Sequence, residues 1–82
     1  MPTATSVSVK DRLLVEIHYD DGRRVEIDLA PELHGPIFEQ LWNDPALFLS
    51  VHVDELGALE WDNGASLAPE FVSGLARFAV SA

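Results

Sequence analysis

Cysteine is absent from this 82-residue sequence, and both basic residues and long apolar runs are scarce. Without cysteine the chain forms no disulfide and has no thiol nucleophile, which fits a reducing compartment. No apolar run approaches the roughly 20 residues that a membrane-spanning helix needs. Residues 1–6 show no basic patch followed by an apolar stretch, so we expect no signal peptide. The composition therefore predicts a cytoplasmic protein without a membrane span.

Recognisable catalytic motifs are also missing. No glycine-rich pattern for nucleotide phosphates occurs, and Ser50, Ser66 and Ser73 lack the glycine-flanked setting of a hydrolase nucleophile. Fourteen carboxylates in a short chain form pairs by chance, so such pairs do not indicate acid–base catalysis. We expect a protein that is not an enzyme and carries no cofactor; a hydrolase built on His52 and nearby acids is the weakest alternative.

Acidic residues dominate the charge. Fourteen Asp and Glu against five Lys and Arg give a net charge of −9. Nucleic-acid binding gains affinity from basic residues that neutralise phosphates. The only local concentration of such residues comprises Lys10, Arg12, Arg23 and Arg24. We therefore expect no direct binding of DNA or RNA, and the acidity either maintains solubility or docks a basic partner protein.

An alternation of apolar and polar residues predicts a first β-hairpin. After a flexible tail over residues 1–6, the pattern is strand-like from Ser6 to Tyr19 and again over residues 23–29. A three-residue loop over residues 20–22 keeps one face apolar and places Gly22 third, where a type I turn with a bulge needs a left-handed residue. The resulting pairs are Tyr19 with Arg23, Ile17 with Val25, Val15 with Ile27, and Leu13 with Leu29.

A helix and a short helical turn are predicted next. Gly35 and Pro36 suit the start of the helix. One apolar face is formed by Ile37, Phe38, Leu41 and Trp42. Asp44 can then cap, and Pro45 begin, a short turn that continues through residues 46–48.

A second hairpin is predicted over residues 49–62, with residues 55–57 as its loop. A three-residue loop again keeps one face apolar and puts a glycine, Gly57, in the third position. The resulting pairs are Val53 with Leu59, Val51 with Trp61, and His52 with Glu60. The two hairpins reach the same loop type independently, which supports both.

The last segment predicts a turn followed by an amphipathic helix over residues 69–79. Asn63 and Gly64 form the turn, Ser66 is suited to cap the helix, and Pro69 suits its first position. The apolar face of this helix is formed by Phe71, Val72, Leu75 and Phe78.

Together these elements predict one α+β domain over residues 1–82. Two β-hairpins form an antiparallel sheet packed against two main α-helices, in the order ββ-α-ββ-α. The apolar face of the sheet is expected to pack on Phe38, Leu41, Trp42, Phe71, Leu75 and Phe78.

Several short motifs occur in a fixed order. They are Asp28-Leu29-Ala30-Pro31, Gly35-Pro36-Ile37-Phe38-Glu39-Gln40-Leu41, Asp44-Pro45-Ala46-Leu47-Phe48, Leu59-Glu60-Trp61-Asp62-Asn63-Gly64, and a proline, Pro69, that opens a helix. In this combination the chain resembles, over about residues 7–76, the bacterial family catalogued as domain of unknown function 2442. The resemblance implies an α+β fold of hairpins and helices and no known reaction.

The resemblance also implies an interaction or sensing module. Some members of the family are fused to a helix-turn-helix DNA-binding domain, for which this chain has no room. Others resemble proteins encoded beside a second small protein, as in toxin–antitoxin pairs. Where the family usually has an acid, two residues after the glycine of its motif, this chain has Ser66, which puts any role of that acid in metal or ligand binding in doubt here.

The segment between the last predicted strand and the last helix is the main candidate site. Its residues are Trp61, Asn63, Gly64, Ser66 and Pro69. In one interpretation Trp61 packs in the core and the Asn-Gly pair only supplies a turn. In the other, Trp61 and Asn63 form the wall of a groove for a ligand or a partner.

Two further sets of residues are weaker candidates. His52, Asp54 and Glu60 can share one face of the second hairpin, although a zinc site needs three or four converging ligands and no metal-binding motif is present. Leu14 is apolar on the otherwise polar face of the first hairpin, and it is a possible interface residue.

Two functional hypotheses follow. The first is a non-enzymatic protein-interaction module with a basic protein as its partner; its specific form is the acidic, antitoxin-like member of a two-protein bacterial system. The second is a small-ligand or metal-sensing module with a pocket near Trp61 and Asn63. A homodimer, formed through an edge strand or the Leu14 face, is compatible with either hypothesis.

Overall fold

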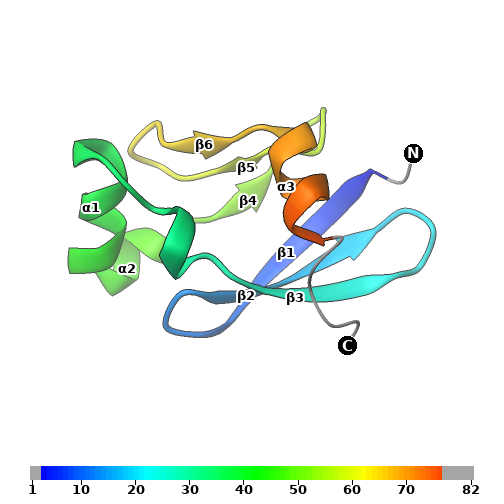
Figure 1. The fold of residues 1–82 in the computed structure, drawn as a ribbon, viewed down its shortest axis with the longest axis horizontal. Coiled ribbons are helices and arrows are strands. Elements are labelled where there is room, and N and C mark those ends of the chain that lie inside the picture. Colours follow the sequence, from blue (N-terminus) through cyan, green and yellow to red (C-terminus); the bar gives the residue numbers. More distant parts are fainter. Residues whose placement is uncertain (1–2, 77–82) are drawn as a thin grey trace.

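Two antiparallel sheets and a few helices make up the computed structural model, which describes residues 3–76 (Figure 1). The strands of the first sheet, in spatial order, are β1 (Ala4–Asp11), β2 (Leu14–Tyr19) and β3 (Arg24–Asp28). The strands of the second are β4 (His52–Val53), β5 (Leu59–Glu60) and β6 (Ser66–Leu67). The helical elements are the 3-10 turn η1 (Ala30–Glu32) and the helices α1 (Pro36–Asn43), α2 (Pro45–Phe48) and α3 (Pro69–Ala76).

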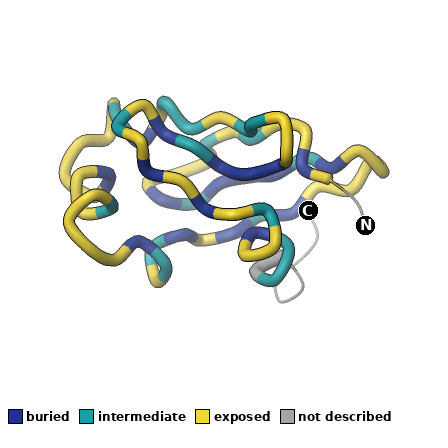
Figure 2. The backbone as a smooth tube through the Cα atoms, turned by 90° about the horizontal axis from the view of Figure 1, so that it is seen from above, coloured by how far each residue is buried: buried dark blue, intermediate teal, exposed yellow. Residues whose placement is uncertain are grey.

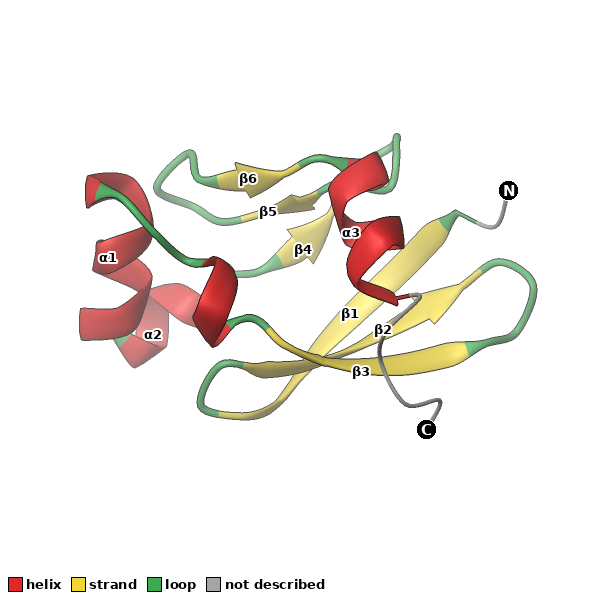
Figure 3. Ribbon diagram, in the orientation of Figure 1, coloured by secondary structure: helices red, strands yellow, loops and turns green. Residues whose placement is uncertain are grey.

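The expected α+β class is confirmed, but the layout differs from ββ-α-ββ-α. Each predicted hairpin carries a third strand, and the hairpins belong to two separate sheets (Figure 3). In Figure 1, α1 and α2 lie at one end of the molecule and α3 lies beside the sheets. Along residues 3–76 the order is therefore three strands, three helical elements, three strands and a helix.

Strand β1 accounts for the first difference. The expected tail is wrong for residues 4–6, which belong to β1, while residues 1 and 2 lie outside the described range. A turn at Arg12 and Leu13 divides the long strand-like run into two antiparallel strands. This turn contains neither glycine nor proline, and its local sequence signal is Asp11, whose Oδ1 atom accepts a hydrogen bond from the Arg12 N–H at 2.8 Å.

The predicted register of the first hairpin is confirmed. Strand β2 pairs Val15 with Ile27 and Ile17 with Val25. At the loop end, the Tyr19 N–H donates to the Arg23 carbonyl at 2.9 Å. The third loop residue, glycine, has a φ of 91°, as a type I turn with a bulge requires.

The second hairpin also has its predicted register over a shorter span. His52 pairs with Glu60 and Val53 pairs with Leu59. The expectation that Leu49 begins the strand is wrong, because this residue is the C-cap that follows α2 and is exposed. The expectation that Ser66 caps the last helix is also wrong, because it pairs with Glu60 as part of β6.

Helices α1 and α2 begin where the sequence predicts. Pro36 and Pro45 each occupy the first helical turn. The Asp44 carboxylate accepts hydrogen bonds from the N–H groups of Ala46 and Leu47, at 3.1 and 3.2 Å, and so caps α2. Helix α3 begins at the predicted Pro69, and residues 77–79 of the predicted helix lie outside the described residues.

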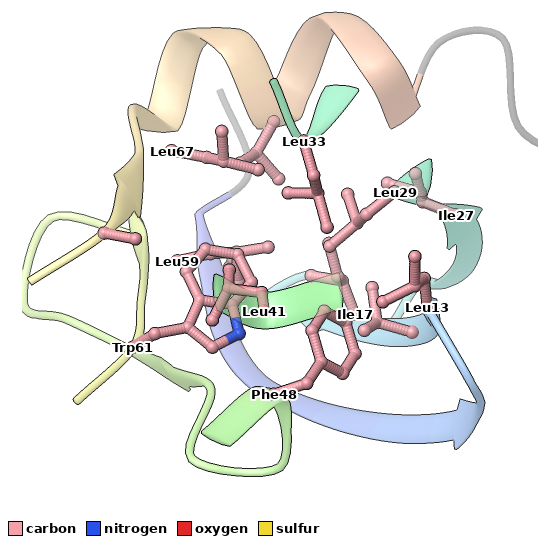
Figure 4. Close-up of a cluster of buried hydrophobic side chains, with 14 of the residues drawn as sticks. Leu13, Ile17, Ile27, Leu29, Leu33, Leu41, Phe48, Leu59, Trp61 and Leu67 are labelled. Atoms are coloured by element: carbon pink, nitrogen blue, oxygen red, sulfur yellow. The ribbon is translucent and has the colours of Figure 1, made fainter. Parts of the chain in front are cut away.

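One hydrophobic core lies between the two sheets and the helices (Figures 2 and 4). Its most completely buried large side chains are Phe48, Ile17, Leu29, Leu41, Leu59, Val15 and Val72. Of the residues expected to cover the sheet, Leu41 is buried and Phe38 is partly buried. Trp42 and Phe71 are exposed, contrary to expectation. The side chains of Leu75 and Phe78 lie outside the described part of the structure.

Candidate functional site

The side chain of Asn63 connects the loop between β5 and β6 to α1 by hydrogen bonds. Its Nδ2 group donates to the Ile37 carbonyl at 3.0 Å and to Gln40 Oε1 at 3.1 Å. Its Oδ1 atom accepts a hydrogen bond from the Ala65 N–H at 3.0 Å. Gly64 completes the turn with a φ of 91°. The amide of Asn63 thus has partners for both its nitrogen and its oxygen inside the fold.

Trp61 belongs to an aromatic cluster in the core (Figure 4). Only 2% of its surface is exposed. The ring of Phe38 meets it edge to face, with the centroids 6.4 Å apart, and the ring of Phe48 lies tilted against it at 5.9 Å. The indole N–H is buried and has no hydrogen-bond partner among the described residues. The geometry gives Trp61 a packing role rather than a place on a surface groove.

The five residues of the main candidate site therefore have different surroundings. Trp61 lies in the core, Asn63 and Gly64 form a turn, Ser66 is exposed on β6, and Pro69 begins α3. Of these five, Pro69 lines a surface hollow of about 240 Å³, which it shares with Tyr19 and residues of the β4–β5 loop. The structure does not bring the five residues together around one cavity.

Polar residues line the outer face of the second sheet. His52, Glu60 and Ser66 follow one another across β4, β5 and β6. Asp54 accepts hydrogen bonds from the N–H groups of Ala58 and Leu56, at 2.9 and 2.8 Å. These bonds, that of Ala58 above all, lower the pKa of the Asp54 carboxyl.

The weak metal candidates do not form a metal site. Within residues 3–76 no group of three or more His, Asp, Glu or Cys side chains is arranged to hold a metal ion. The Asp54 carboxylate is used by the loop that follows it, and His52 Nδ1 lies 3.1 Å from the Ser50 carbonyl. What the outer face offers instead is negative charge.

The distribution of charge separates the two halves of the protein. No Lys or Arg occurs between residues 25 and 76, whereas eight of the fourteen acids occur between residues 29 and 76. The described structure has one ion pair, Arg23 with Asp21, and one histidine–carboxylate hydrogen bond, His18 with Glu16, and both belong to the first sheet and its loop. The acids of the second sheet thus have no described basic partner, and the long stretch without Lys or Arg was the sequence signal for this surface.

The outer face of the first sheet is of mixed charge. Glu16, at its centre, is only 8% exposed, and its Oε1 atom lies 2.9 Å from His18 Nε2. The hydrogen bond with His18 is the main cause that lowers the pKa of Glu16, and the charges of Lys10 and Arg24 act in the same direction. Leu14, the possible interface residue, is half-buried and lines a hollow of about 380 Å³ together with the exposed Trp42.

The architecture and its surfaces thus define a small α+β protein with two three-stranded antiparallel sheets. The model of the family described as protein of unknown function (DUF2442) matches residues 4–76, so the chain belongs to this family, and the resemblance seen in the sequence is confirmed. No curated protein and no solved structure gives a match. Among residues 3–76, no helix has the length and apolar character needed to cross a membrane.

Proposed function

We propose that this protein is a non-enzymatic interaction module that binds a basic partner protein through the second sheet. The proposed surface, which we name the acidic face, consists of the outer side of that sheet and its loops. Its acids are Asp54, Glu55, Glu60 and Asp62. The observation that carries the proposal is that no Lys or Arg occurs between residues 25 and 76 to neutralise them.

The uncompensated charge supports a basic partner on physical grounds. A surface of one sign attracts a partner of the opposite sign, raises the rate of encounter and selects against partners of like charge. On the inner side of the same strands, Leu59 and Leu67 belong to the core and Val53 packs against it, so Glu60 on β5 is turned away from the core. Such an interaction weakens as salt increases, because added ions screen exposed charges.

An exposed leucine beside the acidic face offers an apolar contact. Leu56 is 75% exposed at the β4–β5 loop, next to Glu55. Protein interfaces commonly combine a few buried apolar anchors with a polar rim. Leu56, with the acid Glu55 beside it in the loop, therefore suits a partner surface that presents an apolar pocket next to a basic residue.

We further propose that the partner is the second member of a two-protein bacterial system, in which this chain has an antitoxin-like role. The support for this finer proposal is the acidity of the chain, which suits the binding of a basic protein. An acidic protein that neutralises a basic protein by binding it needs no catalytic group.

Capture of the tagged protein's partners from native cytosol at low and high salt tests the proposal. We expect one stoichiometric basic protein that is retained at low salt and lost at high salt. The double variant Glu55→Lys/Glu60→Lys should weaken that complex about tenfold or more, since it opposes like charges.

A matched control distinguishes the face from the overall charge. The variant Glu32→Lys/Glu39→Lys changes two acids outside the second sheet, on η1 and α1. Each double variant replaces two negative charges by two positive ones, so both change the net charge from −9 to −5. Equal loss of binding in both variants, or no retained protein at either salt, would contradict the proposal.

A further inference from the structure

We infer that two copies of this chain associate through the outer edge of β3, so that their first sheets join into one sheet of six strands. The inference concerns a surface separate from the acidic face, and it holds or fails independently of the proposed function. It rests on two features of β3: the N–H and C=O groups that point away from β2, and the neighbouring opposite charges of Arg24 and Glu26. Strand β3 is the last strand of the first sheet (Figure 3).

The register of the first hairpin fixes which backbone groups of β3 point outward. Hydrogen bonds join Tyr19 N to Arg23 O and Leu29 N to Leu13 O, both at 2.9 Å. In an antiparallel pair, every second residue exchanges hydrogen bonds with its neighbour and the residues between them point away. The residues of β3 that direct N–H and C=O groups away from β2 are therefore Arg24, Glu26 and Asp28. Within residues 3–76, no strand pairs with this edge.

The side chains of Arg24 and Glu26 are adjacent on the outer face of β3. They lie opposite His18 and Glu16, respectively, on β2. Neither takes part in the ion pair of the described structure, which joins Arg23 to Asp21, or in the hydrogen bond between His18 and Glu16. Each therefore retains a charge that a second molecule can pair.

One symmetric register uses all of these features. If two β3 strands pair antiparallel with Val25 on the twofold axis, Arg24 lies opposite the partner's Glu26, and Glu26 lies opposite the partner's Arg24. The same two residues exchange backbone hydrogen bonds in both directions, because both point outward. The four charges then form a square of alternating sign, and opposite charges at such cross-strand positions are stabilising.

The neighbouring registers are less favourable. With Glu26 on the axis, two carboxylates face each other beside Glu16, and like charges directly opposite are destabilising. A slip of one residue would turn the apolar side chains of one copy, including Val25 and Ile27, to the polar face of the other. In the favoured register Val25 meets the partner's Val25 on the apolar side of the sheet.

The expected strength of the association follows from the small area of the interface. A single pair of five-residue strands gives an interface below roughly 1,200 Å², which is the range of weak complexes. We therefore expect a dimer that forms in the micromolar range and dissociates on dilution.

Charge exchange at the edge tests the inference by sedimentation velocity over a series of concentrations. Arg24→Glu and Glu26→Arg should each weaken the dimer about tenfold or more, because each places like charges opposite one another. These variants change the net charge from −9 to −11 and to −7, in opposite directions, so a general charge effect cannot weaken both. The double variant Arg24→Glu/Glu26→Arg should restore the dimer.

A mixture of the two single variants is the most specific test of the register. In the mixed dimer each contact again joins a carboxylate to a guanidinium, so equal amounts of Arg24→Glu and Glu26→Arg should associate with each other more strongly than with themselves. Circular dichroism confirms that each variant is folded. Amide hydrogen exchange provides a second readout, since the Arg24 and Glu26 amides should gain protection as concentration rises while those of Val25 and Ile27, already paired with β2, should not.

Three results would overturn the inference. The first is that the wild-type protein sediments as a monomer even at the highest concentration at which the protein remains soluble. The double variant could remain as weakly associated as the single variants. The mixture could show no preferential association of the two single variants.

Discussion

Asn63 and Ile37, which lie 26 residues apart in the chain, are joined by a hydrogen bond of 3.0 Å from the side-chain amide to the backbone carbonyl. The same amide nitrogen also donates to Gln40, and the amide oxygen holds the turn at Ala65. One side chain therefore orients helix α1 against the second sheet.

We predict that Asn63→Ala lowers the free energy of unfolding by about 1–3 kcal/mol, since it removes several hydrogen bonds at once. Asn63→Asp should also be destabilising, because a carboxylate cannot donate to Ile37 or Gln40. Urea denaturation measures both. Asn43→Ala, at an exposed position of α1, is the control and should change stability little. Equal effects at the two asparagines would refute the role of Asn63.

A comparison of two glycines separates backbone strain from steric conflict. Gly22 and Gly57 have nearly equal φ values of 91° and 89°. A Cβ atom at Gly22 meets nothing within 4 Å, whereas one at Gly57 would lie 3.0 Å from Thr3 Cγ2 and 3.5 Å from the Ala4 nitrogen. We predict that Gly22→Ala costs about 1 kcal/mol of strain and that Gly57→Ala costs clearly more.

Thermal and urea denaturation of the two glycine variants check this order. The additional loss at Gly57 should also appear as faster amide exchange at the start of β1, because the conflict involves Thr3, the residue that precedes this strand. A smaller loss for Gly57→Ala than for Gly22→Ala would show that the β4–β5 loop does not pack against β1 in solution.

The carboxyl group of Glu16 should contribute to the acid sensitivity of the fold. The hydrogen bond with His18, followed by the charges of Lys10, His18 and Arg24, lowers its pKa in the folded state. A group whose pKa falls on folding stabilises the protein fully above its unfolded pKa, here about 4.5, and this stabilisation is lost as pH falls through the folded pKa. Glu16→Gln should therefore flatten the decline of stability between neutral and strongly acidic pH.

The measurement is the free energy of unfolding as a function of pH for Glu16→Gln and for Glu39→Gln, whose carboxylate is exposed on α1. Glu16→Gln should change the slope below about pH 4.5, and Glu39→Gln controls for the loss of one negative charge. Parallel curves for the wild type and both variants would exclude a contribution from Glu16.

Tyr19 carries a buried hydroxyl group without a hydrogen-bond partner among the described residues. The residue is 5% exposed, and burial raises the pKa of its phenol above the ordinary value of 10.0. A raised pKa gives stability that is complete below the unfolded pKa and is lost as pH rises through the folded pKa. Tyr19→Phe should be neutral or stabilising at pH 7, since it removes an unsatisfied polar group, and it should remove part of the alkaline loss above about pH 10.

Denaturation of Tyr19→Phe at neutral and alkaline pH tests both statements. The guanidinium of Arg23 lies over the Tyr19 ring, 5.2 Å from its centroid, and phenylalanine keeps that contact. A substantial loss of stability at pH 7 would show that the hydroxyl has a partner in solution.

Much of the local structure was predictable from the sequence because it depends on neighbouring residues. The parity of apolar residues fixed the registers that pair Val15 with Ile27 and Val53 with Leu59. The cap at Asp44 and the starts of the helices at Pro36 and Pro69 follow from local backbone chemistry.

The candidate site was less predictable. The residue types of Trp61 and Asn63 suit either a groove or a core, and only the fold shows that aromatic rings surround the first and that α1 accepts hydrogen bonds from the second. The acidic face, by contrast, has a direct sequence signal in the absence of Lys and Arg between residues 25 and 76. The sequence signal does not say on which side of the sheet the acids lie. The strand pairing answers this, because it places Glu60 beside His52 and away from the core.

The sequence by itself determined the α+β class, the two hairpin registers, the helix starts and the excess of negative charge, because periodicity, turn residues and ionisable groups act over short distances. Tertiary structure decided that residues 4–11 form a third strand, that Ser66 joins β6 instead of capping a helix, and that Trp42 is exposed while Trp61 is buried. These outcomes depend on which distant backbone edges and apolar surfaces meet, and the free energy of those contacts is defined only when the whole chain has folded.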